Sequence, residues 1–216
     1  MSPSHLVLVF TTLTYLLFFF WYGGSAAPLT GEEADAMIDE IEANAKELAG
    51  PDYDRELIES FRVLSRVDDG REFYMLNLMR FRQKAVYPES YEHDYDDDAM
   101  AAASRYNAAV IPALLARGSL PILMGRYAGP FIPPLGTERW DQIGIIRYRS
   151  RRDMLSMAME LSSTGGGAHK GASLEKTVVF PIEPIFDFVF VRGFVLFLCA
   201  GTGGTLAWAL RRLEGR

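Results

Sequence analysis

The pattern of hydrophobic and polar positions is clearest in residues 140–159. Residues 140–149 alternate between two faces and carry isoleucines at their centre, which predicts a strand. Ser150 is a favourable helix N-cap, and Asp153 stands three positions later, so a helix is expected from Ser150 to Ser162. A strand that leads into a helix in this way is half of a split βαβ unit.

The other half of the unit lies upstream. Residues 72–82 are apolar on both faces, as expected of a covered central strand. A helix is expected over 104–117, with Ser104 as its N-cap and with Pro112 kinking or dividing it. The remaining expected elements are strands at 120–127 and 174–182 and a glycine-rich loop at 163–171.

Two amphipathic helices are expected before the first strand. The first covers 30–49, with Thr30 and Glu33 as a capping box, and the second covers 54–67. The resulting order, β-α-β-β-α-β behind two helices, predicts an α+β fold on the ferredoxin-like plan. Both helices of that plan cover one face of the sheet, so an apolar second face would pack on another copy. We expect Asn77 and its Met and Phe neighbours on this open face.

Both ends of the chain are strongly apolar. Residues 6–22 contain no charge over 17 positions, and residues 193–210 form a second uncharged run of 18. Each run is long enough for a transmembrane helix, although the first is also compatible with a signal peptide cleaved after Ala26. Ala200 and Gly204 have a spacing that suits helix packing. The chain therefore divides into an anchor or signal peptide (1–27), a helical lead-in (28–70), an α+β domain (71–184) and a C-terminal membrane helix with a basic tail (185–216).

The arginines near the C-terminus predict an orientation. Arg211, Arg212 and Arg216 follow the second apolar run, whereas Arg192 alone precedes it. Under the positive-inside rule the C-terminus is expected in the cytoplasm and the domain outside it, in a periplasmic or extracellular position.

Charge and cysteine content narrow the range of partners. Of 22 Lys and Arg residues four lie in the last 25 positions, and of 28 Asp and Glu residues one does, so the rest of the chain carries 18 basic and 27 acidic residues. This acidic balance argues against nucleic acid as a partner. The single cysteine, Cys199, lies in the second apolar run, so the middle of the chain forms neither a disulfide nor a thiolate metal site.

Residues 72–182 resemble the DUF1330 family, whose members are dimeric α/β-barrel domains of unknown function. The matching motifs are MLNLMRF at 75–81, Tyr106, Pro112 to Leu114 with Gly118, WDQIGIIRYRSRRDMLSM at 140–157, and His169 with Leu174 to Lys176. The chain departs from the family pattern at Tyr148-Arg149-Ser150, at Gly165–Gly167 and in its two membrane segments. The resemblance implies the fold and a homodimer, and it brings no established reaction.

Asn77 and His169 are the candidates for catalysis. An amide in the middle of an apolar strand face needs a hydrogen-bond partner, which either a neighbouring element or a ligand in a cavity would provide. His169 is expected in a loop, either as a solvated residue or as a general base or axial metal ligand. Together with Trp140, these residues match in kind and order those of cofactor-free and haem-degrading monooxygenases of the superfamily, which is an analogy at the level of the fold.

Ligand binding has four candidates: Asn77, Trp140, Asp141 and Tyr148. Trp140 would equally suit a core or dimer contact, and Asp141 at the start of a strand would equally bind backbone or an arginine. The acidic residues between Tyr91 and Asp98 lack the glycine and the spacing of a calcium loop, so a solvated acidic surface is expected there and no metal site.

Three functions remain open on the sequence alone. The first is a membrane-tethered, dimeric module that binds a small apolar ligand or serves as an interaction domain. The alternative is an enzyme of the cofactor-free monooxygenase or haem-degrading kind that uses Asn77 and His169 in a barrel cavity. In the third, the membrane helices carry the function, with Gly201 and Gly204 at their contact. The sequence identifies no cofactor and does not decide whether the protein is an enzyme.

Overall fold

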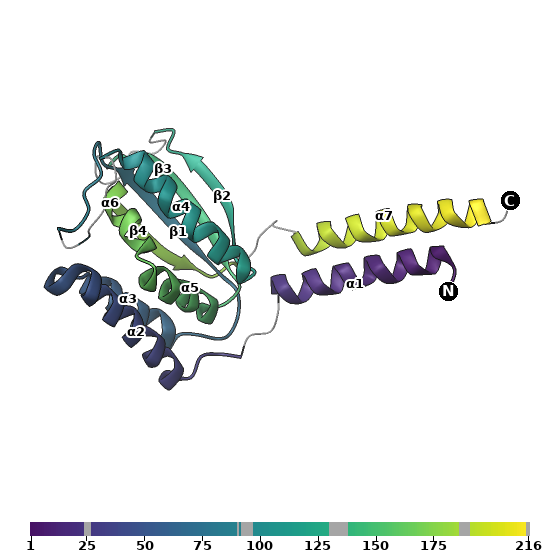
Figure 1. Ribbon diagram of the computed structural model, residues 1–216, viewed down its shortest axis with the longest axis horizontal. Helices are drawn as coiled ribbons and strands as arrows, with labels where there is room; N and C mark the ends of the chain where they lie inside the picture. Colours follow the sequence, from purple (N-terminus) through teal and green to yellow (C-terminus); the bar gives the residue numbers. More distant parts are fainter. Residues whose placement is uncertain (24–26, 90, 92–96, 130–137, 186–190, 215–216) are drawn as a thin grey trace. The chain divides into compact units, whose positions relative to one another are not determined.

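The computed structural model describes residues 1–23, 27–89, 91, 97–129, 138–185 and 191–214. The chain forms two separate units, one made of residues 1–25 and 185–216 and the other of residues 26–184. Figure 1 labels the helices and strands of both.

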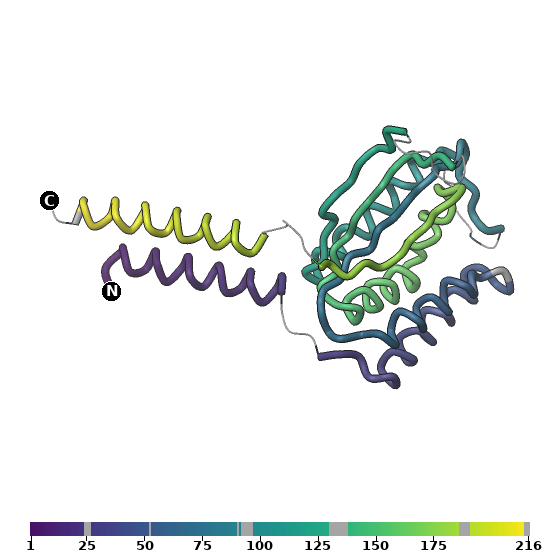
Figure 2. Tube along the Cα trace, turned by 180° about the vertical axis from the view of Figure 1, so that it is seen from behind, coloured from purple at the N-terminus to yellow at the C-terminus, as the bar shows by residue number. Residues whose placement is uncertain are grey.

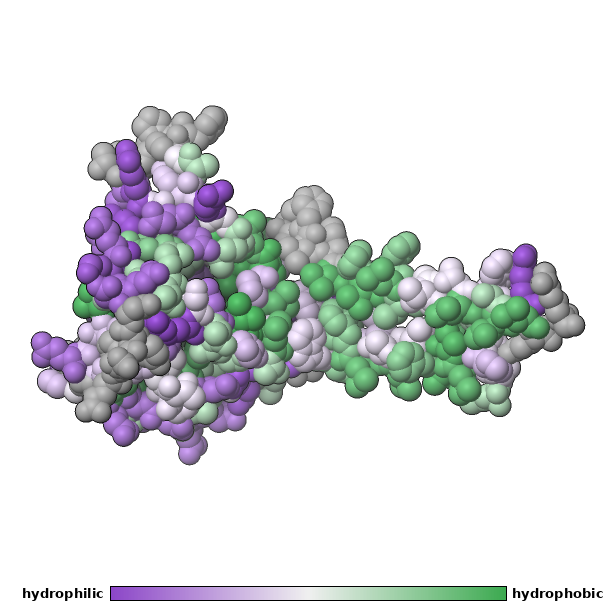
Figure 3. Space-filling model, turned by 45° about the horizontal axis from the view of Figure 1, so that its top comes forward, coloured by the Kyte–Doolittle hydropathy of each residue, from purple (hydrophilic) through white to green (hydrophobic). Residues whose placement is uncertain are grey.

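The terminal unit is a pair of helices. α1 (Pro3–Gly23) and α7 (Val191–Glu214) run side by side in opposite directions. Both are long and apolar enough to cross a membrane, and apolar side chains cover much of their surface in Figure 3. The two helices approach closely at Gly203, where an added Cβ would lie 2.5 Å from Oγ1 of Thr11. The small residues expected at the helix contact, Gly201 and Gly204, face open space instead.

Two capped helices open the second unit. α2 (Gly31–Ala49) begins with the expected capping box, because Thr30 accepts from the Glu33 amide and Glu33 accepts from the Thr30 amide. After a short 3-10 turn, η1 (Gly50–Asp52), α3 (Arg55–Arg66) is capped by Asp54. α2 and α3 pack mainly on α5 (Arg151–Ser163), to which Asn44 is bound by a 3.0 Å hydrogen bond from Nδ2 to Oγ of Ser162.

Four antiparallel strands form the sheet, in the order β2-β3-β1-β4. They are β1 (Phe73–Phe81), β2 (Leu120–Arg126), β3 (Gln142–Tyr148) and β4 (Leu174–Ile182), so all four expected strands are present. α4 (Ala99–Ala116) connects β1 to β2, while α5 and α6 (Gly166–Ser173) connect β3 to β4. The unit is therefore an α+β domain, as expected.

One face of the sheet packs on the helices. Phe73 pairs with Tyr148 across β1 and β3, and their rings stack with centroids 5.4 Å apart. Both belong to a hydrophobic core with Val110 and Leu114 of α4 and Leu155 of α5. Side chains alternate along a strand, so the helix-facing side also carries Met75 and Asn77. The expectation that Asn77 lies on the open face was wrong, because both faces of β1 are apolar and periodicity could not distinguish them.

The opposite face of the sheet is apolar along its middle and partly exposed there, whereas Tyr74 and Arg147 at one end of it are buried; Figure 2 shows this face from the side away from α4. Leu76 and Leu78 pair with Ile145 and Ile143 of β3 and with Phe180 and Val178 of β4. Side chains on both outer strands of this face are well exposed: Leu123 by 51%, Phe180 by 41%, and Val178 and Ile182 by 36%. We refer to these eight side chains as the open sheet face.

α4 begins earlier than its sequence suggested. Its N-cap is Asp98, which accepts from the Met100 amide, whereas Ser104 lies inside the helix and donates to the Met100 carbonyl. Pro112 also lies inside the helix without dividing it. The buried positions include Val110, Ala113 and Leu114, while Ile111 and Leu115 are 41% and 42% exposed.

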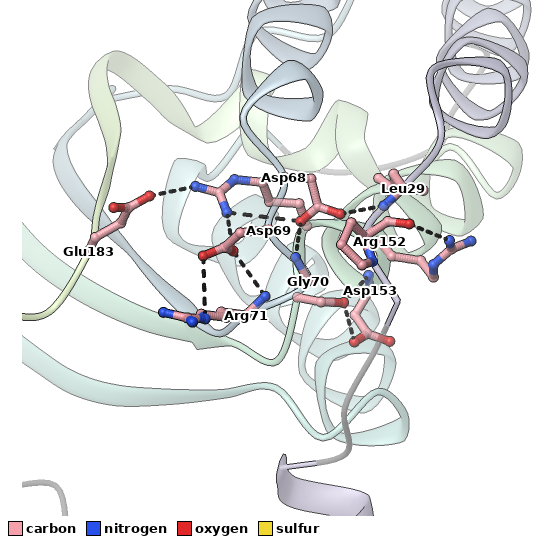
Figure 4. Close-up of polar contacts among 11 residues, drawn as sticks. Leu29, Asp68, Asp69, Gly70, Arg71, Arg152, Asp153 and Glu183 are labelled. Carbon is pink, nitrogen blue, oxygen red and sulfur yellow. Dashed lines mark hydrogen bonds and ion pairs between the residues drawn. The ribbon is translucent and has the colours of Figure 1, made fainter.

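Arg151, at the start of α5, contacts acidic residues from two other parts of the domain; Figure 4 labels these partners, Asp68, Asp69 and Glu183. Arg151 is 2% exposed, and its guanidinium lies 3.2 Å from Asp69 and 2.9 Å from Glu183. Asp68, beside it at 3.9 Å, also accepts from the backbone amide of Leu29. The turn before β1, the start of α5 and the chain after β4 are thereby held together.

Candidate ligand-binding site

α6 forms where we expected a glycine-rich loop. Gly165 has a positive φ of 70°, which suits glycine, and it directly precedes the helix. An added Cβ at Gly166 would lie 3.3 Å from Cβ of Ala109, so α6 packs on α4 at very short range. Glycines have weak helix propensity, and here close packing on α4 compensates for it.

His169 is buried on α6 and is 8% exposed, which excludes the solvated loop position. Its Nδ1 shares a 2.9 Å hydrogen bond with the hydroxyl of Tyr87, and the planes of the His169 and Tyr91 rings stand at 82° to each other in an edge-to-face contact. Tyr87 and Tyr91 stack on each other, and Arg105 of α4 donates to the Tyr87 hydroxyl at 3.4 Å. The histidine is therefore held in one orientation by the segment that follows β1.

Lys170 is the next residue on α6, and its ammonium lies 5.7 Å from the centre of the Tyr106 ring of α4. Burial lowers the pKa of Lys170, because the charged form is poorly solvated there. Burial also raises the pKa of Tyr106 to about 12. In the described part of the chain, neither side chain forms a hydrogen bond or an ion pair with another residue.

Tyr148, a candidate ligand-binding residue, lies at the end of β3 on the helix-facing side. It is 8% exposed. Burial, and then the charge that an ionised Tyr106 would carry, raise the pKa of Tyr148. Within the described ranges its hydroxyl has no hydrogen-bond partner, so the only specific contact of the ring is the stacking on Phe73.

Asn77 lies in the middle of β1, between Gly144 of β3 and Val179 of β4. Its Nδ2 donates to the Met75 carbonyl at 3.1 Å. Gly144, opposite Asn77 on β3, has no side chain, and Met124 of β2 packs into the space beside it: an added Cβ at Gly144 would lie 3.2 Å from Sδ of Met124. Asn77 thus binds the Met75 carbonyl and His169 binds Tyr87, and no hydrogen bond among the described residues joins the two candidates for catalysis.

Trp140 and Asp141 lie at the other end of β3 from Tyr148. Oδ2 of Asp141 accepts from the Phe81 amide at 2.8 Å, and its backbone amide donates to the Met79 carbonyl. Trp140 is half-buried, with the ammonium of Lys176 5.7 Å from its ring. Asp141 therefore fixes the entry into β3 through backbone contacts. Of the four ligand-binding candidates, Trp140 and Asp141 lie before β3, Tyr148 lies at its far end, and Asn77 lies on the neighbouring strand β1.

The acidic stretch falls only in part within the described residues. Glu92, His93, Asp94, Tyr95 and Asp96 lie outside them. Asp97 forms an ion pair with Lys84, and Asp98 caps α4. Across the residues with a described position, no group of three His, Cys, Asp or Glu side chains is arranged to hold a metal ion.

The candidate residues described above all belong to the α+β domain with its four-stranded antiparallel sheet. No family model matches the chain, and no curated protein matches it. Two crystal structures are similar: the methylated RPA0582 protein (23% identity, 65% of this chain and 98% of that chain, TM-score 0.53) and RPA0582, a protein of unknown function from Rhodopseudomonas palustris (24% identity, 63% and 97%, TM-score 0.52). At this identity the likeness concerns the fold alone.

Lys170 and Tyr87 were not among our candidates from the sequence. Tyr87 lies 82 positions before His169, and nothing in its sequence surroundings indicates a histidine partner. Lys170 follows three glycines and a histidine, and only the packing of α6 on α4 places it beside Tyr106.

Proposed function

We propose that the protein is a membrane-tethered module whose domain forms a homodimer through the open sheet face and binds a small ligand on the helix-facing side. The observation that carries the proposal is the set of eight apolar side chains on the face that the helices leave uncovered. Such a surface is larger than the scattered apolar positions of an ordinary monomer surface.

A ferredoxin-like dimeric α/β barrel, similar to DUF1330 domains, is the fold that we propose in detail. The strand order β2-β3-β1-β4 supports it, as do the positions of α4 between β1 and β2 and of α5 between β3 and β4. The motifs at 75–81 and 140–157 and the uncharacterised structural neighbours are compatible with it.

The energetics favour pairing of two open faces. Leu123, Val178, Phe180 and Ile182 each expose between 36% and 51% of their surface. Burying that surface in a dimer stabilises the dimer by on the order of 1 kcal/mol per side chain, and each of the two partners contributes its own set of side chains. α2 and α3, which precede the sheet in sequence, pack mainly on α5 and leave this face available.

Membrane attachment is proposed to involve both terminal helices, with the domain on the extracytoplasmic side and the C-terminus in the cytoplasm. The arginines at 211 and 212 lie in the last turn of α7, in agreement with the positive-inside rule. The packing of α1 on α7 supports an α1 that is retained as an anchor, because Gly203 provides the space that Thr11 occupies.

Native mass spectrometry of the full chain released from detergent micelles tests this proposal. We expect a species of two chains, each of 24.2 kDa, that carries additional small-molecule mass. A single chain under conditions that preserve other membrane dimers would contradict the dimer. A mass increment of haem would instead favour the enzyme alternative with Asn77 and His169.

A further inference from the structure

We propose that the cavity between α2 and α3 binds the headgroup of phosphatidylethanolamine from the membrane that α1 and α7 are proposed to cross. This inference rests on the membrane attachment in the proposed function and names a lipid partner for the domain. The cavity has a volume of about 360 Å³ and lies between the start of α2 and the end of α3. Cavities that bind small molecules begin at about 300 Å³, so the volume suits a headgroup better than a whole lipid.

The cavity lies where the chain enters and leaves the domain. Leu29 lines it and follows Gly23, the last residue of α1, by six positions. An extended chain spans about 3.5 Å per residue, so this connection is no longer than about 20 Å. Asp68 also lines the cavity and lies 3.9 Å from Arg151, which binds Glu183 at 2.9 Å shortly before the chain continues to α7 (Figure 4). Both connections to the proposed membrane helices therefore start beside the cavity and keep it within reach of lipid headgroups.

Arg66 provides a cation for the lipid phosphate. It lines the cavity, it is exposed, and among the described residues its guanidinium forms no hydrogen bond and no ion pair. The other arginine of the cavity, Arg62, is held by Asp39 at 2.8 Å and by Glu42 at 3.2 Å. A guanidinium binds phosphate oxygens through two parallel N–H groups, and Arg66 is the arginine of this cavity that has them available.

Asp35 provides a carboxylate for the ammonium of the headgroup. Its side chain is 68% exposed, and in the described domain its carboxylate contacts only Arg62, at 3.5 Å. The second carboxylate of the cavity, that of Asp68, already accepts from the Leu29 amide at 2.6 Å.

The charges that line the cavity define the headgroup. Two arginines and two carboxylates line it, so a ligand with one negative and one positive group complements it better than a simple anion does. The ammonium of ethanolamine has three N–H donors for a carboxylate, whereas the trimethylated nitrogen of choline has none. This difference favours phosphatidylethanolamine over phosphatidylcholine.

Native mass spectrometry of the full chain tests the assignment, with micelles that contain equal amounts of phosphatidylethanolamine, phosphatidylcholine and phosphatidylglycerol. We expect the chain to retain phosphatidylethanolamine at least about threefold more than either other lipid. Arg66→Gln should lower this retention at least about threefold, because the phosphate loses its cation, and Asp35→Asn should abolish the preference over phosphatidylcholine. Arg71→Gln and Glu40→Gln are the matched controls: both residues are exposed and lie outside the cavity, so neither change should alter retention.

Soluble phosphoethanolamine distinguishes a lipid from a free phosphate ester, because it carries the same charged groups without acyl chains. At a concentration equal to that of the lipid it should leave most of the lipid bound. Equal retention of the three lipids, full retention by an Arg66→Gln variant with an unchanged urea midpoint, or displacement by soluble phosphoethanolamine would overturn the assignment. If the chain enters phosphatidylcholine nanodiscs but no variant alters lipid retention, this site is wrong and the membrane attachment stands. A chain that stays outside nanodiscs would contradict both.

Discussion

The hydroxyl of Tyr87 lies 2.9 Å from Nδ1 of His169, so a residue from the segment after β1 fixes the one buried histidine of the described domain. This hydrogen bond joins two side chains that are 82 positions apart in the sequence. It holds the segment after β1 against α6. Its loss would leave a ring nitrogen of a buried histidine without its partner.

Tyr87→Phe is therefore expected to lower the free energy of unfolding by about 1–2 kcal/mol, because a buried polar atom loses its partner while the ring packing is kept. Urea titration followed by near-ultraviolet circular dichroism measures the change. Tyr127→Phe is the matched control: in the described structure the Tyr127 side chain makes no hydrogen bond, so a change within about 0.5 kcal/mol is expected. Equal effects of the two substitutions would show that the bond to His169 contributes nothing.

Arg151 supports a second prediction about stability. Arg151→Met removes a guanidinium that is 2% exposed and leaves the buried carboxylate of Asp68 without its cation, so a loss of about 3 kcal/mol is expected. Arg71→Met is the control, since Arg71 is 85% exposed and lies 3.8 Å from the same Asp69 that Arg151 contacts. That change should cost less than about 0.5 kcal/mol in the same urea titration. Comparable losses in both variants would mean that burial of the pair is unimportant.

The ion pair between Glu33 and Arg152 predicts how stability depends on pH. The hydrogen bond from Arg152, followed by that from the Thr30 amide, lowers the pKa of Glu33 to about 2. Because the folded-state pKa lies below the usual glutamate value of 4.5, the pair stabilises the domain above about pH 4.5, and this contribution is lost as the pH falls toward 2.

Glu33→Gln keeps a side chain that can complete the capping box, and it removes only the charge. We expect the variant to be less stable than the wild type at pH 6 and the difference in urea midpoint to shrink as the pH approaches 2. A difference that stays constant from pH 6 to pH 2 would contradict the assigned pKa.

The contact between Gly203 and Thr11 makes the pairing of α1 with α7 testable. Thr11→Cys combined with Gly203→Cys, in a Cys199→Ser background, brings two Cβ positions within about 3.1 Å, close enough for a disulfide after a small adjustment. Mass spectrometry of the oxidised protein should find the linked peptides within one chain. Thr11→Cys with Gly204→Cys should give none, because Gly204 faces open space. A mature protein that lacks residue 11 would mean that α1 is a cleaved signal peptide.

Local sequence signals were sufficient for most elements of the fold. Alternation and β-branched residues located β3, and the capping chemistry of Ser150 placed the start of α5, because strand alternation and helix capping depend on near neighbours. α6 was missed for the opposite reason: glycines favour a loop, and only contacts with α4, such as that of Gly166 with Ala109, make the helix stable.

The candidate site was less accessible to sequence reasoning. Asn77 and Tyr148 could be chosen as candidates from the sequence, but the face on which Asn77 lies could not be derived from a strand that is apolar on both sides. The contact of the Lys170 ammonium with the Tyr106 ring depends on where α6 packs on α4, which the spacing of residues along the chain does not reveal.

Substitutions on the two faces of β4 test the dimer most directly. Val178 lies on the open sheet face and Val179 on the helix-facing side, and the two are 36% and 40% exposed on the same strand. Sedimentation velocity of the full chain in detergent should show a dimer for the wild type and for Val179→Lys, and a monomer for Val178→Lys, because only the latter places a charge in the proposed interface. A dimer that persists in Val178→Lys and in Phe180→Lys would contradict pairing through the open sheet face.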